Sequence, residues 1–146
     1  VNRSKLFVME RFGSGLLKDM EENLNAELIS TYIEMTRFPA PKGDFYKDTN
    51  GLGGLVRAAD FIGQLGDPDY FRKTPALFYE FQELGVNEKL GYKSPHDMRK
   101  NYASFYWNQV NPFLQDALNY LRLTEDGKHW VANMHSHVFD SEHVYK

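Results

Sequence analysis

An aspartate, Asp60, stands where a simple amphipathic helix would not place an acid. In "RAADFIGQ" it follows two alanines and precedes an apolar pair. Because helical residues three and four apart share a face, Asp60 lines up with Val56, Arg57, Gly63 and Gln64. Spacing alone favours a surface ion pair between Asp60 and Arg57. The alternative is a carboxylate that points toward the core, which requires a partner or a metal ion to offset its desolvation.

A His-Asp dipeptide, His96-Asp97, is a second group that could hold a metal. It directly follows Ser94-Pro95, which is typical of the first turn of a helix. An acid in that turn stabilises the helix dipole, and a histidine there is commonly solvated. We therefore interpret the dipeptide as part of a helix start.

The C-terminal segment "HWVANMHSHVFDSEH" carries most of the histidines of the chain. His135 and His137 are two residues apart, so a helix directs them to different faces. His129 and His137 share a face but lie two turns apart. The spacing favours a solvated terminal helix over a zinc or nickel site.

The segment "GDFYKDTNGLGG" contains acids and glycines that suggest a calcium loop or a phosphate loop. It lacks the twelve-residue spacing and the closing glutamate of a calcium loop. No strand precedes Gly51, Gly53 and Gly54, and no Gly-Lys-Ser/Thr follows them. We expect a helix start that needs open backbone angles.

The composition limits the classes of protein. The 146 residues contain 42% hydrophobic and 25% charged residues, which is typical of one globular domain, and no cysteine, which excludes thiolate chemistry. A net charge of −3 without a basic cluster argues against a nucleic-acid surface. No apolar run is long enough to span a membrane, and no signal-peptide pattern opens the chain, so we expect a cytoplasmic protein.

The periodicity predicts an all-α fold, an irregular helical bundle of about six helices in a single domain over residues 1–146. Helices are expected at 3–19, at 21–37 and from after Asn50 to near Gly66. A fourth helix is expected from Pro68, with Asp67 as its cap, to 84, with Pro75 as a kink or restart. Further helices are expected at 94–121, where Asn111-Pro112 should bend the helix or split it in two, and after Thr124 and Asp126-Gly127. Residues 38–50 and 85–93 are expected to be loops. The chain opens at Val1 with "VNRSKLFVMERF", which has no helix cap. This indicates either an altered start or the later part of a longer protein.

Three stretches carry a resemblance to a known family. "LVRAADFIGQLGDPDYFRKTPALFYEF" (Leu55–Phe81) resembles the C-terminal half of bacterial HD-domain proteins, the metal-dependent phosphohydrolase superfamily. "TRFPAP" (Thr36–Pro41) and "NEKLGYKSPHDMRKNYASFYWNQVNPFLQDALNYL" (Asn87–Leu121) are similar to the same group. The resemblance covers about residues 2–135 and implies an HD-domain or phosphodiesterase-like helical bundle.

The resemblance implies a divalent metal ion (Mn, Mg, Fe, Ni or Zn) held by a first His, an adjacent His-Asp pair and a later Asp. Asp60 matches the later Asp, but no histidine precedes His96, so three of the four implied ligands are missing. One carboxylate does not hold a catalytic metal, because such sites usually need three protein ligands or more. The expected ligands would lie upstream if the chain is the later part of a longer protein.

Two functions are therefore expected. The first is a metal-dependent phosphohydrolase for a nucleotide or another phosphoester, incomplete or inactive as this chain. Asp60 would be a metal ligand, Arg57 or Gln64 would orient it, and Arg37 or Arg57 would face the substrate phosphate. The second is a non-catalytic helical module for binding or oligomerisation that keeps the HD-type packing, for example as a homodimer through exposed aromatic faces.

Overall fold

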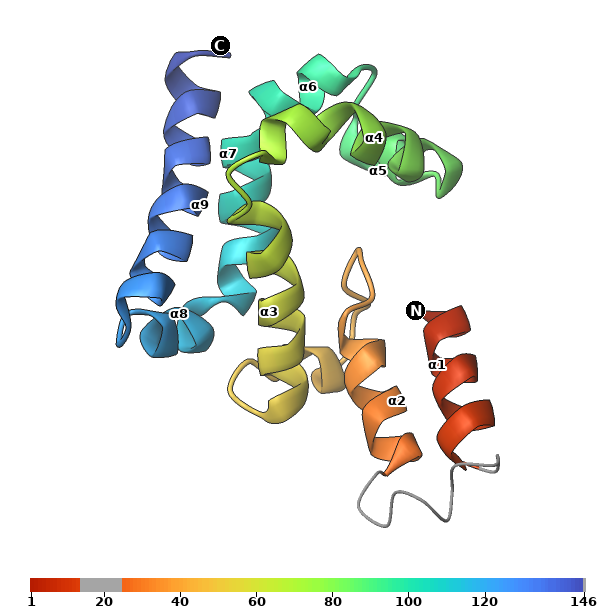
Figure 1. The fold of residues 1–146 in the computed structure, drawn as a ribbon. Coiled ribbons are helices and arrows are strands. Elements are labelled where there is room, and N and C mark those ends of the chain that lie inside the picture. Colours follow the sequence, from red (N-terminus) through yellow and green to blue (C-terminus); the bar gives the residue numbers. More distant parts are fainter. Residues whose placement is uncertain (14–24, 146) are drawn as a thin grey trace. The chain divides into compact units, whose positions relative to one another are not determined.

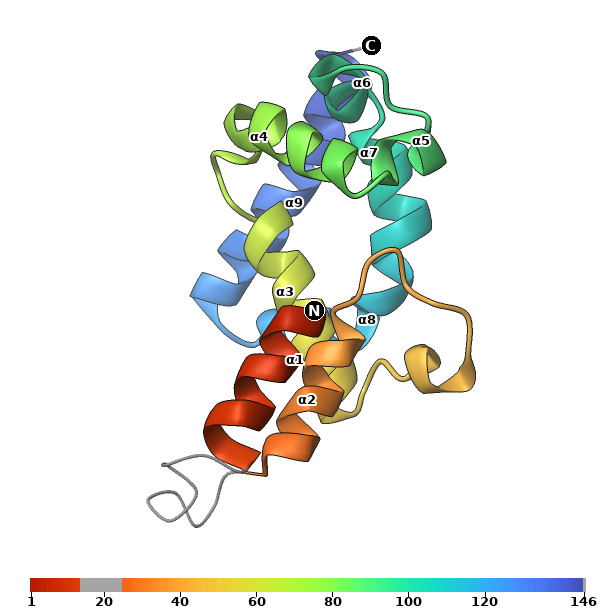
Figure 2. The same cartoon turned by 90° about the vertical axis from the view of Figure 1, so that its right-hand side faces the viewer.

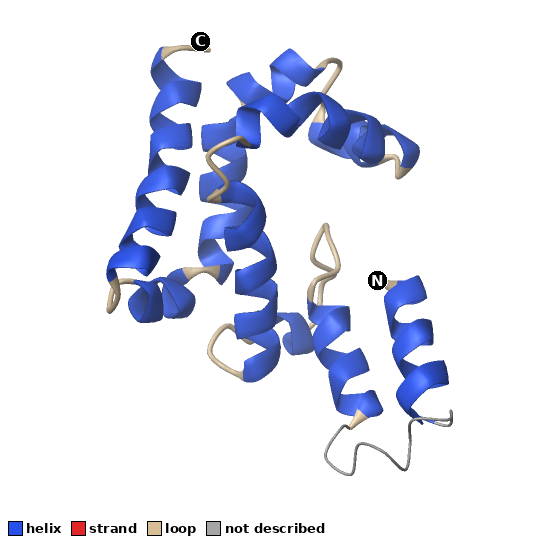
Figure 3. Ribbon diagram, viewed as in Figure 1, coloured by secondary structure: helices blue, strands red, loops and turns tan. Residues whose placement is uncertain are grey.

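The computed structural model describes residues 1–13 and 25–145, and within them all regular structure is helical (Figure 3). The α-helices are α1 (Asn2–Val8), α2 (Ala26–Met35), α3 (Leu52–Leu65), α4 (Tyr70–Glu83), α5 (Val86–Leu90), α6 (Pro95–Lys100), α7 (Tyr102–Phe105), α8 (Gln115–Leu121) and α9 (Glu125–His143). The all-α prediction is confirmed, although the described residues form more helices than the six expected. None of the described helices combines the length and apolar content needed to cross a membrane.

The chain divides into two compact units, Val1–Asp60 and Phe61–Lys146, with the boundary inside α3. In the first unit α1 and α2 lie side by side (Figure 1). A π-helical turn, Met9–Gly13, continues α1 and also contacts α2. Asn25 caps α2 by accepting a hydrogen bond from the Leu28 amide at 2.9 Å. The predicted helix segments at 14–19 and 21–24 lie outside the described residues.

The second unit packs α7 and the segments after it against α9 (Figure 2). Its most buried large side chains are Tyr102, Tyr106, Val110, Leu114 and Met134. Thr124 caps α9 by accepting from the Gly127 amide at 3.0 Å, so Asp126-Gly127, which were expected to precede this helix, lie in its first turn.

The split predicted at Asn111-Pro112 is confirmed, but the helix predicted from Ser94 is wrong in its first part, because the chain also breaks at Asn101. At the first break Ser141 of α9 replaces the missing helical bonds: its hydroxyl donates to the Lys100 carbonyl at 3.0 Å and accepts from the Ala103 amide at 3.1 Å. At the break around Pro112, a π-helical turn (Tyr106–Val110) and a 3-10 turn (Asn111–Phe113) precede α8. Pro112 has no N–H to donate, so a regular ladder cannot continue there.

The loop predicted at 85–93 is wrong in its centre, where α5 lies between two glycines. Gly85 and Gly91 take left-handed backbone angles, with φ of 64° and 76°, that begin and end this short helix. Pro75, by contrast, lies inside a continuous α4, so no restart occurs there.

Candidate functional site

Asp60 is exposed on α3, so the expectation that its carboxylate points toward the core is wrong. The buried face of α3 is formed by Arg57, Ala58, Ile62 and Leu65. The opposite face carries apolar residues as well, with Leu52 64% and Val56 39% exposed. Ala59 and Gly63 complete this exposed face, on which Asp60 is the only acid.

Arg57 is a buried structural residue, with 1% of its surface exposed. Its guanidinium donates to the carbonyl of Tyr46 at 2.8 Å and to the carbonyl of Asp48 at 2.6 Å. Burial lowers the pKa of Arg57, an effect that the nearby Asp48 carboxylate opposes. Arg57 therefore holds against α3 the 44–51 loop, which begins with a 3-10 turn, Asp44–Lys47.

The glycines at the start of α3 serve this same packing and do not form a phosphate cradle. A Cβ on Gly54 would lie 2.7 Å from the backbone of Asp48 and Thr49. The Gly51 amide donates to the Asp48 carboxylate at 2.9 Å. Neither Gly51 nor Gly54 has a positive φ, so the expectation that these glycines provide open backbone angles is wrong. They are glycines because residues 48 and 49 approach them too closely for a Cβ.

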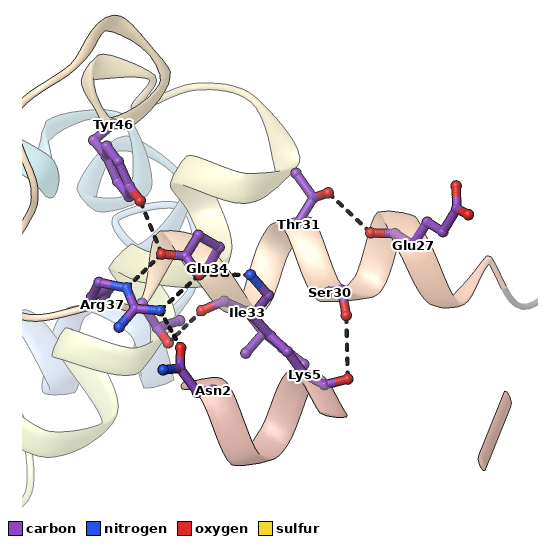
Figure 4. A network of polar contacts seen from close by, with 10 residues as sticks. Asn2, Lys5, Glu27, Ser30, Thr31, Ile33, Glu34, Arg37 and Tyr46 are labelled. Atoms are coloured by element: carbon purple, nitrogen blue, oxygen red, sulfur yellow. Dashed lines mark hydrogen bonds and ion pairs between the residues drawn. The ribbon is translucent and has the colours of Figure 1, made fainter. Parts of the chain in front are cut away.

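Arg37 belongs to a network centred on Glu34 of α2 (Figure 4). The Glu34 carboxylate accepts from Arg37 Nε at 2.5 Å, from Lys5 Nζ at 2.8 Å and from the Tyr46 hydroxyl at 2.9 Å. A second Arg37 nitrogen donates to Asn2 Oδ1 at 2.6 Å. The guanidinium therefore joins α1, α2 and the loop after α2.

Tyr46 connects the two arginines and was not singled out from the sequence. Its hydroxyl bonds to Glu34, which Arg37 also contacts, while its carbonyl accepts from Arg57. Hydrogen bonding to Glu34 and burial raise the pKa of Tyr46, so it remains a neutral donor. A lone tyrosine in a loop rich in Gly and Asp carries no sequence signal for this role.

Replacing Glu34 by glutamine should destabilise the protein by about 2 kcal/mol, because two cations lose their carboxylate partner. Hydrogen bonds from Arg37 and then Lys5 hold the pKa of Glu34 well below its ordinary value of 4.5. A depressed carboxyl pKa stabilises the fold above the unfolded-state value, and the stabilisation is lost as pH falls toward the folded-state value. Urea unfolding from about pH 6 to about pH 3 should therefore show a steeper loss of stability in the wild type than in Glu34→Gln. Parallel pH profiles would contradict the assignment.

Gln64 lies in a different place, in a groove formed by the last turn of α3 and by α4. The four residues predicted as a site thus have separate surroundings: Asp60 on the exposed face of α3, Arg57 buried beneath the loop, Arg37 in the Glu34 network and Gln64 in the groove. Asp60 and Gln64 are one helical turn apart on α3.

The His96-Asp97 dipeptide begins α6, as predicted. Ser94 accepts from the Asp97 amide at 3.2 Å, and the Asp97 carboxylate accepts from the Lys93 amide at 2.9 Å. Hydrogen bonding to the Asp97 carboxylate from the Lys93 amide, and then from the Ser94 side chain, lowers the pKa of Asp97. His96 is exposed and Ser94 is the N-cap residue, so the dipeptide lies in the first turn of α6.

The C-terminal helix is not simply a solvated helix, because His137 is buried. Its Nδ1 lies 2.9 Å from the Leu65 carbonyl, and its ring packs among Tyr70, Phe71 and Tyr102. His135 contacts the Tyr106 hydroxyl at 3.3 Å, and burial lowers its pKa. In residues 1–13 and 25–145, no three His, Cys, Asp or Glu side chains are grouped so that they could hold a metal ion.

A protein family described as Npun_R2479-like matches residues 1–144 of the chain. Neither the curated proteins nor the solved structures include a significant match.

Proposed function

Since the chain belongs to the Npun_R2479-like family, we propose that this family shares the HD-type site and that Asp60 supplies one carboxylate to it. The other ligands would come from residues that this sequence does not contain. By itself the chain would then not hydrolyse phosphoesters. The complete site would act on a phosphorylated small molecule such as a nucleotide.

The observation that supports this proposal is the exposed face of α3. A helix with apolar residues all around is normally covered on every side, and α3 exposes Leu52, Val56 and Ala59 beside the Asp60 carboxylate. An added element would cover this face and bring the carboxylate into a drier environment. There a carboxylate requires a cation or hydrogen-bond donors.

The described residues do not fit a catalytic metal on their own. Asp60 offers oxygen donors that suit several divalent ions, but one carboxylate falls short of the three protein ligands that such sites usually have. No catalytic step is therefore assigned to this chain. Under the proposal, Arg57 acts through packing, because it fixes the start of the helix that carries Asp60.

A second candidate function is a non-catalytic module that pairs with another chain through the same exposed face. Leu52 and Val56 favour it, since exposed apolar side chains that adjoin one another often mark an interface. Light scattering of the protein at micromolar concentration measures its oligomeric state and so distinguishes the two candidate functions. A dimer that Val56→Lys dissociates would support the module.

The experiment for the metal proposal is a calorimetric titration with Mn²⁺. It compares two proteins: this chain, and an N-terminally extended version that includes any residues encoded upstream of Val1. Each is measured with and without the Asp60→Asn substitution. We expect binding in the extended protein, weakened at least about tenfold by Asp60→Asn, as the loss of even an outer-shell group can do. The substitution should change the free energy of unfolding by less than about 0.5 kcal/mol, because Asp60 is exposed. Equal Mn²⁺ affinity with and without the Asp60 carboxylate would refute the proposal. The matched control is Asp69→Asn, which removes another exposed carboxylate.

A further inference from the structure

A groove of about 400 Å³ lies within the second unit, between the last turn of α3 and α4. Its lining includes Gly63, Asp67, Tyr70, Lys73, Leu77 and Glu80. Pockets of about 300–1,000 Å³ are the usual size for small-molecule ligands. The groove thus has room for a small organic molecule.

Gly63 forms part of this groove and has no packing reason to be glycine. A Cβ placed on Gly63 would meet no atom within 4 Å, whereas a Cβ on Gly66 would lie 2.6 Å from the Trp130 ring. Glycine inside a helix is less stable than alanine, and one use that offsets this cost is close approach of a ligand to the backbone. The space over Gly63 is therefore a suitable place for part of a ligand.

The charges around the groove favour a cation. Asp67 and Glu80 contribute two carboxylates, and Lys73 contributes one ammonium group. Lys73 bonds to Asp67, whose carboxylate also accepts from the Asp69 amide at 2.8 Å. Glu80 is exposed and leaves the groove with an excess of negative charge.

The apolar part of the lining favours a ligand with a hydrocarbon body. Leu77 is half-buried and Ala76 is exposed, so both offer apolar surface within the groove, whereas Tyr70, with 7% of its surface exposed, contributes little. We infer that this groove binds a small primary amine carried on a short apolar or aromatic body, with the ammonium near Glu80 and the body against Ala76 and Leu77. This inference does not depend on the metal proposal.

The test is saturation-transfer NMR on the 146-residue protein with two probes of equal size and opposite charge, phenethylamine and 3-phenylpropionate. We expect the amine to bind about tenfold more tightly than the carboxylate, since the reversal of charge replaces attraction by repulsion. Glu80→Gln should weaken amine binding about threefold, and Glu88→Gln on α5, outside the groove, should leave it unchanged.

Gly63→Leu supplies the steric control. Its side chain should fill the space over α3 and abolish amine binding, while the melting temperature stays the same or rises because leucine favours the helix. Absence of amine binding to the wild type, equal binding of both probes, or retained binding in a folded Gly63→Leu variant would each overturn the inference.

Discussion

Arg57→Met should lower the free energy of unfolding by about 3 kcal/mol, because truncation removes the donors that two partly buried carbonyls use. The carbonyls of Tyr46 and Asp48 lie 2.8 Å and 2.6 Å from the guanidinium, and both belong to the loop before α3. Methionine keeps the apolar volume of the side chain but offers no hydrogen. Since small domains are stable by only about 5–15 kcal/mol, this loss should be readily visible in urea unfolding.

Two control variants separate this structural role from a general effect of lost charge. Arg37→Met removes a guanidinium that is 34% exposed and should cost clearly less than Arg57→Met, because solvent screens its ion pair. Arg57→Lys keeps a cation but lacks the fork that reaches both carbonyls. We therefore expect its loss of stability to be smaller than that of Arg57→Met and larger than that of Arg37→Met. A stability of Arg57→Met equal to that of the wild type would show that the loop does not depend on this residue.

Gly54→Ala should destabilise the protein by about 3 kcal/mol, the upper end of the range for overpacking, because the added methyl would meet backbone. Its Cβ would lie 2.7 Å from the Asp48 carbonyl oxygen and from Thr49, and these atoms belong to the loop that Arg57 also holds. The loop that contains Asp48 and Thr49 must therefore move away from α3. The measurement is the urea concentration at the midpoint of unfolding, which should fall while the dependence of the unfolding free energy on urea concentration stays the same.

Gly63→Ala is the matched control in the same helix, with the opposite expected sign. No atom lies within 4 Å of its Cβ, so the substitution should stabilise the protein by about 0.5–1 kcal/mol through helix propensity alone. Destabilisation of similar size by both substitutions would mean that the close approach of the loop to Gly54 is incorrect.

Local signals in the sequence were sufficient for several elements. The helix start at Ser94-Pro95 and the region of α3 were predicted because capping and hydrophobic periodicity depend on residues close together in the chain. The break at Asn101 was missed because its cause is distant: Ser141 is 38 residues after Ala103 and supplies the bonds from another helix. Helix α5 was missed because five residues are too few to show a period.

The candidate site was harder to predict than the fold, because it depends on which face of a helix is covered. Arg57 and Asp60 are three residues apart, yet one is buried and the other is exposed. Spacing puts them on neighbouring parts of α3 but does not show which side meets the preceding loop. His137 illustrates the same limit, since the Leu65 carbonyl that it contacts lies 72 residues earlier in the chain.

Thiol labelling of α3 tests most directly whether Asp60 lies on an open face, and the protein has no cysteine to interfere. Asp60→Cys should react with a thiol reagent at nearly the rate of the same variant unfolded in urea. Ala58→Cys, whose native side chain is 0% exposed, should react at least about 100-fold more slowly than its unfolded form. Protection of Asp60→Cys equal to that of Ala58→Cys would contradict the account, because the carboxylate would then be inaccessible to ligands from outside the chain.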